Sequence, residues 1–200
     1  MDFQDLIASD PSGFLDGQLL IAMPGIGDDR FDRAVIRLVN HSEAGAVGFV
    51  VNHVAEIEVD DLLARAGVEA DAGMADPIIP STLEVVRGGP VEDSRGFVLH
   101  SPDYTSDGTI RLDEDLALTS TLDVLRAVAR GAGPRKALLA LGYAGWGAGQ
   151  LEDELRENVW LTVDADTSLL FDVPSDERYA TALGRIGVAP SALSEVAGNA

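Results

Sequence analysis

The residues best suited to chemistry lie in two glycine-rich stretches of the chain. The first is LGYAGWGAGQLEDEL (141–155), in which four glycines surround Trp146 before an acidic run begins. A strand, a glycine-rich turn and a helix in this order match a dinucleotide-binding unit, where glycines let the backbone approach a pyrophosphate. The spacing argues against that chemistry, because Gln150 occupies the third glycine position and the acids at 152–154 would repel a phosphate from the helix start.

A packed structural turn is the favoured interpretation of the same stretch. Glycine permits positive φ angles and the close approach of another chain segment. The indole N–H of Trp146 needs a partner when it is buried, and Gln150 can donate and accept hydrogen bonds near the helix start. A turn that also lines a small binding cleft is the second interpretation.

The second stretch is RGGPVEDSRGF (87–97), in which a sharp Gly-Gly-Pro reversal is flanked by Arg87 and Arg95. If neighbouring strands bring the two arginines together, they could bind an anion. We favour the alternative in which both arginines pair with nearby acids such as Glu92.

The three histidines match no metal motif. His41, His53 and His100 each end a predicted strand, where imidazoles could converge on zinc. Their spacings fit no ligand pattern and no cluster of acids accompanies them, so we expect no metal and no cofactor. The chain also lacks cysteine and a Gly-x-Ser-x-Gly sequence. No catalytic residue is therefore nominated, and the sequence favours a protein without enzymatic activity.

The net charge of the chain disfavours some classes of binding partner. Fourteen basic residues stand against 34 acidic ones, a formal net charge of −20, and Lys136 is the only lysine. Such a chain is repelled by duplex nucleic acid and by anionic membranes. No apolar run approaches the roughly 20 residues that span a bilayer, and the acidic N-terminus does not resemble a signal peptide. We therefore expect a cytoplasmic protein without nucleic-acid or membrane contacts.

The elements that must position these residues form a predicted α+β fold. Helices are expected at 59–68, between Ser120 and Gly131, at 149–158 and from Ser175 onward. Strands are expected at 17–24, 34–41, 44–54, 83–91, 96–102, 108–120 (a hairpin), 136–146, 159–166 and 168–173. About eight or nine strands in clusters between about four helices predict a mixed, mostly antiparallel sheet. We expect one domain over 1–200, with 1–13 and 188–200 peripheral, and an exposed loop at 69–80.

Five longer motifs carry a resemblance to a known family. They are LIAMPGIGDDRFDRAVI, HSEAGAVGFVVN, RGGPVEDSRGFVLHS, ALGYAGWGAGQLEDELRENVWL and RYATALGRIGV, in this order along the chain. Together they resemble the AlgH/YqgE family of bacterial proteins over roughly residues 14–187. The chain departs from that pattern at His53, where members often carry lysine, and it lacks the cysteine found in some members.

The resemblance implies a fold more than an activity. It implies an α+β arrangement around a bulged, coiled β-sheet in a small cytoplasmic protein. The family has no established biochemical activity or catalytic residue. Its AlgH name comes from a proposed role in regulating alginate production, and members are often described as transcriptional regulators.

Three hypotheses of function follow. The favoured one is a non-enzymatic regulatory or interaction module that contacts an unidentified protein partner, with a homodimer as an open alternative. The second is a small-molecule binder or hydrolase that uses a cleft between 87–100 and 142–150. The third, direct DNA binding, is opposed by the net charge of −20. The candidate binding residues for the second hypothesis are Asn52, Arg87, Gly88, Gly89, His100, Tyr143, Trp146 and Gln150.

Overall fold

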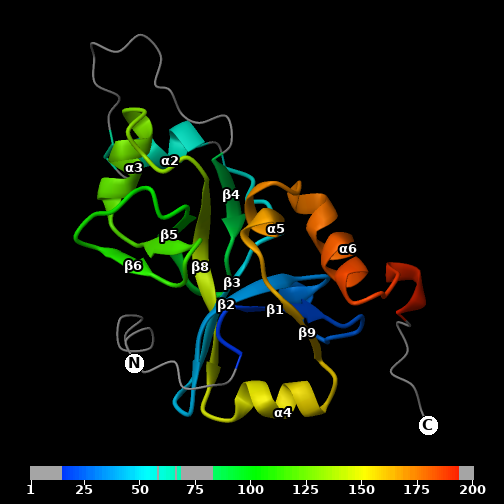
Figure 1. Cartoon of the computed structure of the whole chain (residues 1–200). Helices are drawn as coiled ribbons and strands as arrows, with labels where there is room; N and C mark the ends of the chain where they lie inside the picture. Colours follow the sequence, from blue (N-terminus) through cyan, green and yellow to red (C-terminus); the bar gives the residue numbers. More distant parts are fainter. Residues whose placement is uncertain (1–14, 58, 66, 69–82, 194–200) are drawn as a thin grey trace.

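The computed structural model describes residues 15–57, 59–65, 67–68 and 83–193 (Figure 1). The loop expected at 69–80 and the peripheral segment expected at 1–13 lie outside these residues. The described chain ends in the short 3₁₀ helix η2 (Pro190–Ala192).

One nine-stranded sheet forms the centre of the molecule. Its strands are β1 (Gln18–Ala22), β2 (Val35–Ser42), β3 (Gly45–Val50), β4 (Glu84–Arg87), β5 (Val91–His100), β6 (Thr109–Arg111), β7 (Ala117–Thr119), β8 (Ala137–Gly147) and β9 (Trp160–Asp164). Their order is β6-β7-β5-β8-β3-β2-β1-β9, and β4 also pairs with β8. All pairs are antiparallel except β4 with β8. The predicted mixed, mostly antiparallel sheet of eight or nine strands is confirmed.

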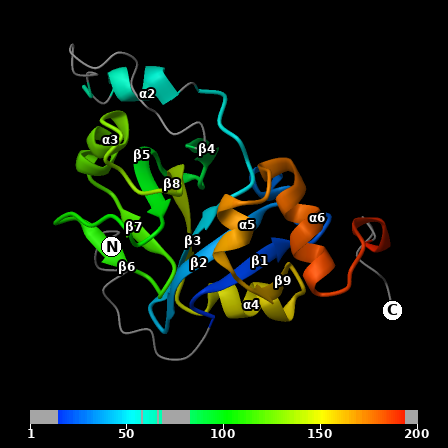
Figure 2. The same ribbon diagram turned by 45° about the horizontal axis from the view of Figure 1, so that its top comes forward.

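The long strand β8 joins two halves of this sheet. Its first part pairs with β4 and β5, and its last residues pair with β3. Figure 2 shows β5, β6 and β7 on one side of the molecule and β1 and β9 on the other. The register shifts within β2 and within β5. Such bulges increase the local twist of a sheet, in agreement with the bulged, coiled sheet that the resemblance implies.

The described residues contain five α-helices, where four were expected. They are α2 (Val59–Arg65), α3 (Leu122–Ala129), α4 (Gln150–Arg156), α5 (Thr167–Phe171) and α6 (Ser175–Arg185). The additional helix is α5, so the strand predicted at 168–173 is wrong. Leu169 and Leu170 are both buried, and a short apolar run of this kind fits a strand and a buried helical turn equally well. The N-cap favours the helix over a strand, because the Asp166 carboxylate accepts hydrogen bonds from the backbone N–H groups of Ser168 and Leu169.

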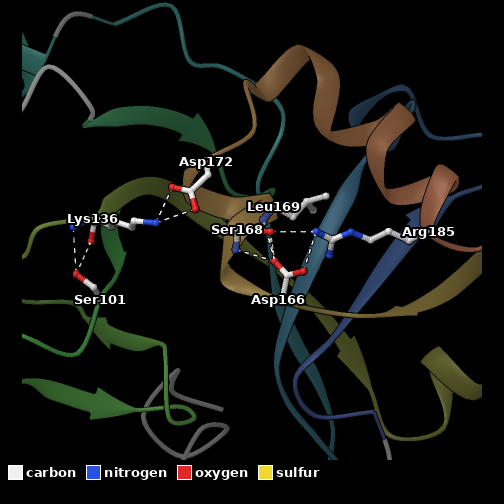
Figure 3. Close-up of polar contacts among 7 residues, drawn as sticks. All are labelled: Ser101, Lys136, Asp166, Ser168, Leu169, Asp172 and Arg185. Carbon is white, nitrogen blue, oxygen red and sulfur yellow. Dashed lines mark hydrogen bonds and ion pairs between the residues drawn. The ribbon is translucent and has the colours of Figure 1, made fainter.

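Removing this cap gives a first prediction. Asp166 also pairs with Arg185 of α6 at 2.9 Å, and Lys136 holds Asp172 at the far end of α5 (Figure 3). The hydrogen bond from Ser168, followed by the charge of Arg185, lowers the pKa of the Asp166 carboxyl. We expect Asp166→Ala to lower the free energy of unfolding at pH 7 by about 1 kcal/mol.

The pH dependence of this effect has a defined sign. Because the pKa of Asp166 is lower in the folded protein, its contribution is present above the unfolded pKa of about 3.9 and is lost as pH falls through the folded value. Thermal unfolding should therefore show a smaller difference between wild type and variant at pH 3 than at pH 7. Asp164→Ala, an exposed carboxylate with one 3.4 Å bond to Gln18, is the control. An equal loss in both variants would contradict the capping role.

Three groups of helices cover three parts of the apolar core. Helices α5 and α6 bury Leu170 and Leu183 in a cluster with Phe49 and Phe97, whose ring centroids lie 5.3 Å apart. Helices α2 and α3 cover the β4–β5–β8 part of the sheet. Helix α4 closes the other end of β8 over Trp146 (Figure 1). The chain segments around residues 29–33, 52–53 and 87–90 lie at the boundary between these groups of helices.

Candidate functional site

Two adjoining cavities lie at this boundary and share Asp32 and His53. The first has a volume of about 700 Å³. Its lining residues are Asp29, Arg30, Asp32, His53, Arg87, Gly89, Pro90, Asp93 and Leu141. The second has a volume of about 820 Å³ and is lined by residues of α6 together with Pro24, Asp32, Arg33, Asn52 and His53. We call the two cavities together the His53 groove.

The groove is organised by two consecutive side chains after β3. The Asn52 side chain accepts a hydrogen bond from the Val35 backbone at 2.7 Å and donates one to the Arg33 carbonyl at 2.8 Å. His53 Nε2 lies 2.9 Å from the Asp32 carbonyl oxygen. Both side chains thus hold the segment that precedes β2. Arg33 lies in this segment with a φ of +49°, a conformation that L residues rarely adopt and that is concentrated at functional sites.

Two arginines of the groove are unpaired. Among arginines whose side chains the structure describes, only Arg33 and Arg87 make no hydrogen bond or ion pair through the guanidinium. Arg30, on the same rim, is neutralised by Asp28 at 2.6 Å. In a chain with 34 acidic residues, the groove thus presents two free guanidiniums in adjoining cavities.

His53 contributes a neutral imidazole to this site. Burial lowers its pKa, the hydrogen bond to the Asp32 carbonyl opposes that shift, and the charge of Arg87 lowers the pKa further. The ring is therefore uncharged at neutral pH. Because a carbonyl can only accept, Nε2 carries the proton and Nδ1 carries the lone pair. Nδ1 bonds to no described residue, so it can accept a proton or hydrogen bond from a ligand held by the arginines.

The structure separates the eight predicted site residues. Asn52, Arg87 and Gly89 line the His53 groove. His100 is fully buried, with Nε2 2.8 Å from the Thr119 hydroxyl. Trp146 lies under α4, far along β8, and Gln150 begins that helix.

The glycines and Tyr143 form the backbone contact between the two predicted cleft walls. Gly88 donates its N–H to the Leu141 carbonyl at 2.7 Å. A Cβ on Gly89 would lie 2.1 Å from the Tyr143 carbonyl carbon, and one on Gly142 would lie 2.4 Å from the Gly89 oxygen. The stretches 87–100 and 142–150 therefore touch where glycine is required, and Arg87, Gly89, Pro90 and Asp93 of the first stretch also line the groove.

Trp146 and Gln150 belong to a hydrogen-bonded network around Glu154. The indole N–H groups of Trp146 and Trp160 both donate to Glu154 Oε2, at 2.8 and 2.7 Å. Gln150 accepts from the Gly147 N–H at 3.0 Å and donates to Glu154 Oε1 at 2.9 Å. The expected partner of the Trp146 N–H is thus found. Carboxylates already occupy this helix start, in agreement with the structural interpretation of 141–155.

The prediction for the two flanking arginines holds for one of them. Arg95 pairs with Glu92 at 2.8 Å and lies over the Phe97 ring at 5.0 Å. Arg87 does not pair, because β4 leads it into the groove. The three histidines also separate, with His41 3.1 Å from Glu152. No group of three or more His, Cys, Asp or Glu side chains suited to a metal occurs within the part of the chain described.

Sequence reasoning missed Asp32, Arg33 and the role of His53 in the groove. The run DDRFDR mixes arginines with acids, so its sequence indicates mutual neutralisation rather than a free guanidinium. A usable signal was the pair Asn52-His53 directly after a buried strand, because polar side chains at a strand end often bind neighbouring loops. The positive φ of Arg33 has no sequence signature.

Comparison with known proteins identifies the family. A family model described as AlgH-like matches residues 19–191. This chain belongs to the AlgH-like family. UPF0301 proteins from Rhodospirillum rubrum and Bradyrhizobium diazoefficiens are each 50% identical to it, over 189 and 192 residues; both alignments cover 94% of this chain, with 95% and 90% of the relatives.

Solved structures agree with the fold of this AlgH-like protein. The solution structure of AlgH from Pseudomonas aeruginosa has a TM-score of 0.74 and 42% identity, covering 96% of this chain and 98% of that one. The crystal structure of DIP2367 from Corynebacterium diphtheriae has a TM-score of 0.69 and 20% identity, covering 96% of each chain, and shows the shared fold alone. None of the helices in the described residues has the length and apolar character needed to cross a membrane.

Proposed function

We propose that this AlgH-like protein is a binding protein without catalytic activity, and that the His53 groove takes a small molecule with a carboxylate or phosphate group. The observation that carries this proposal is the pair of unpaired guanidiniums, Arg33 and Arg87, in adjoining cavities. Guanidinium binds carboxylate and phosphate through charge-assisted hydrogen bonds. Cavities of about 300–1,000 Å³ suit small ligands.

The rest of the lining restricts the ligand further. Asp29, Asp32 and Asp93 also face the first cavity, so a ligand with several negative charges would meet repulsion outside the arginines. Carboxylates accept hydrogen bonds from hydroxyl groups. A ligand with one anionic group attached to a hydroxylated body therefore fits the groove best, such as a hydroxy acid or a sugar phosphate.

Arg87→Gln tests the groove directly. We expect wild-type protein to bind glycolate or glycerol 3-phosphate in isothermal titration, and the variant to bind at least tenfold more weakly. A hydrogen bond to a charged group contributes about 1.5–3 kcal/mol, and about 1.4 kcal/mol is a factor of ten. The control is Arg126→Gln, an exposed arginine of α3 paired with Asp123. Equal affinities for the two variants would count against the groove.

A regulatory role through protein contacts is the second candidate. The formal net charge of −20 favours protein contacts over nucleic acid. This candidate would be supported if none of a set of small anions bound to the protein and a partner protein were recovered by pull-down. Hydrolysis of a nitrophenyl ester or phosphate that is abolished by His53→Gln would instead make the groove an active site, with Nδ1 as the general base.

A further inference from the structure

A smaller cavity of about 190 Å³ lies where the curled sheet meets itself. It is lined by Asp16 and Gly17 before β1, by residues 37–40 of β2, and by residues 110–113 of the β6–β7 hairpin. Three strands separate β2 from β7 in the sheet order, so only the curl brings these segments together. The cavity shares no lining residue with the His53 groove.

Two buried charged atoms in this cavity have no hydrogen-bond partner. The Arg37 side chain is 5% exposed, and its Nη2 donates to Asp113 at 2.6 Å, but Nη1 is buried without a partner. The Asp16 carboxylate accepts from the His41 backbone N–H through one oxygen, and its Oδ2 is buried without a partner. Buried polar atoms are nearly always satisfied, so a group bound in this cavity could supply both missing partners.

The two charges are close but do not pair with each other. Burial is the largest effect on the pKa of each group, raising that of Asp16 and lowering that of Arg37, and each charge acts against the shift of the other. Neither forms an ion pair with the other. Gly17 lies close against this guanidinium, because an added Cβ would come within 3.3 Å of Arg37 Nη1. Asp16 and Arg37 both line the cavity, so a small molecule in it can contact both side chains.

We propose that this cavity binds a small zwitterion of the α-amino acid class. Its ammonium group donates to Asp16 Oδ2, and its carboxylate accepts from Arg37 Nη1. An anion alone would face the Asp16 carboxylate, and a cation alone would face Arg37, whereas a zwitterion satisfies both without adding net charge to a buried site. The cavity volume of about 190 Å³ restricts the ligand to short side chains. The bound ligand bridges β2 to the β6–β7 hairpin and stabilises the curl.

Titration of ¹⁵N-labelled full-length protein with glycine tests this site by NMR. We expect saturable shifts of the Gly17 and Leu112 amide signals with glycine. Acetate and methylammonium, which each carry one half of the zwitterion, should produce no saturable shift at the same concentration. A response to acetate alone would overturn the zwitterion, as would a flat glycine titration. A crystal structure grown in glycine that shows only water between Asp16 and Arg37 would also overturn it.

Variants separate binding from folding. Asp16→Asn keeps the shape but removes the charge, and we expect it to weaken glycine binding at least tenfold. Arg37→Lys keeps the positive charge but replaces the two NH2 groups of the guanidinium with a single ammonium group. It should also weaken glycine binding, while the contact with Asp113 persists. Asp123→Asn, an exposed acid of α3, should bind like wild type. Wild-type affinity in Asp16→Asn would exclude the proposed ammonium contact.

Discussion

Arg178→Met is expected to lower the free energy of unfolding by about 3–5 kcal/mol, the range for removing one partner of a buried charge network. Arg178 of α6 is 3% exposed. Its guanidinium pairs with Glu84 of β4 at 2.7 Å and donates to the carbonyls of Val173, at 3.0 Å, and Val51. Methionine keeps most of the apolar stem but leaves a carboxylate and two carbonyls without their donor.

The loss should be visible in thermal unfolding. Each kcal/mol shifts Tm by about 2–4 °C in a chain of this size, so we expect a fall of roughly 6–20 °C. The matched control is Arg185→Met on the same helix. Arg185 is 25% exposed and pairs with Asp166, which is 59% exposed, so its loss should be about 1 kcal/mol or less.

A double variant identifies the cause. Adding Glu84→Gln to Arg178→Met removes the orphaned carboxylate and should recover part of the lost stability. Additive losses would show that the two side chains do not interact. Because Val51 directly precedes Asn52 and His53, Arg178→Met should also weaken anion binding in the His53 groove, whereas Arg185→Met should not.

Glu154→Ala is expected to lower the free energy of unfolding by about 2–4 kcal/mol. The two indole N–H donors of Trp146 and Trp160 share Glu154 Oε2. Both rings are nearly buried, 6% and 3% exposed, and their centroids lie 5.9 Å apart, edge to face. A buried donor left unsatisfied costs about 1–3 kcal/mol, and two donors lose their acceptor together.

Intrinsic fluorescence reports this network selectively, because these are the two tryptophans of the chain. We expect Glu154→Ala to shift the emission to the red and to lower Tm, since water reaches the indoles. Glu154→Gln keeps an acceptor oxygen and should lose less stability. The control, Glu157→Ala, changes an exposed residue at the end of the same helix. An emission spectrum identical to that of the control would show that another acceptor replaces Glu154.

Local patterns predicted most of the fold. The apolar runs at 17–24, 34–41 and 44–54 gave β1, β2 and β3, and the short loop between the last two gave an antiparallel pair. These predictions succeeded because strand formation and hairpin pairing depend on neighbouring residues. The run at 168–173 failed because its state depends on one side-chain cap at Asp166 and on burial against distant residues.

The candidate site was only partly predictable. Arg87 and Asn52 were nominated from their motifs, and both line the groove. Arg33 was not, because its neighbours in sequence are acids that should neutralise it. Trp146 and Gln150 were nominated for a cleft, but their polar groups bond within the α4 network.

The sequence by itself determined the family, the α+β class and the strong negative charge. Each of these depends on composition or on motifs within one segment. Only the tertiary structure decided which arginines lack a partner and which side chains share a cavity. Residues 33, 53 and 87 come from three separate segments. The Arg87 N–H donates to the His53 carbonyl at 2.7 Å, and His53 Nε2 lies 2.9 Å from the Asp32 carbonyl oxygen, so hydrogen bonds between distant segments bring the three residues together. A charge is free or paired according to its neighbours in space, and these contacts set those neighbours.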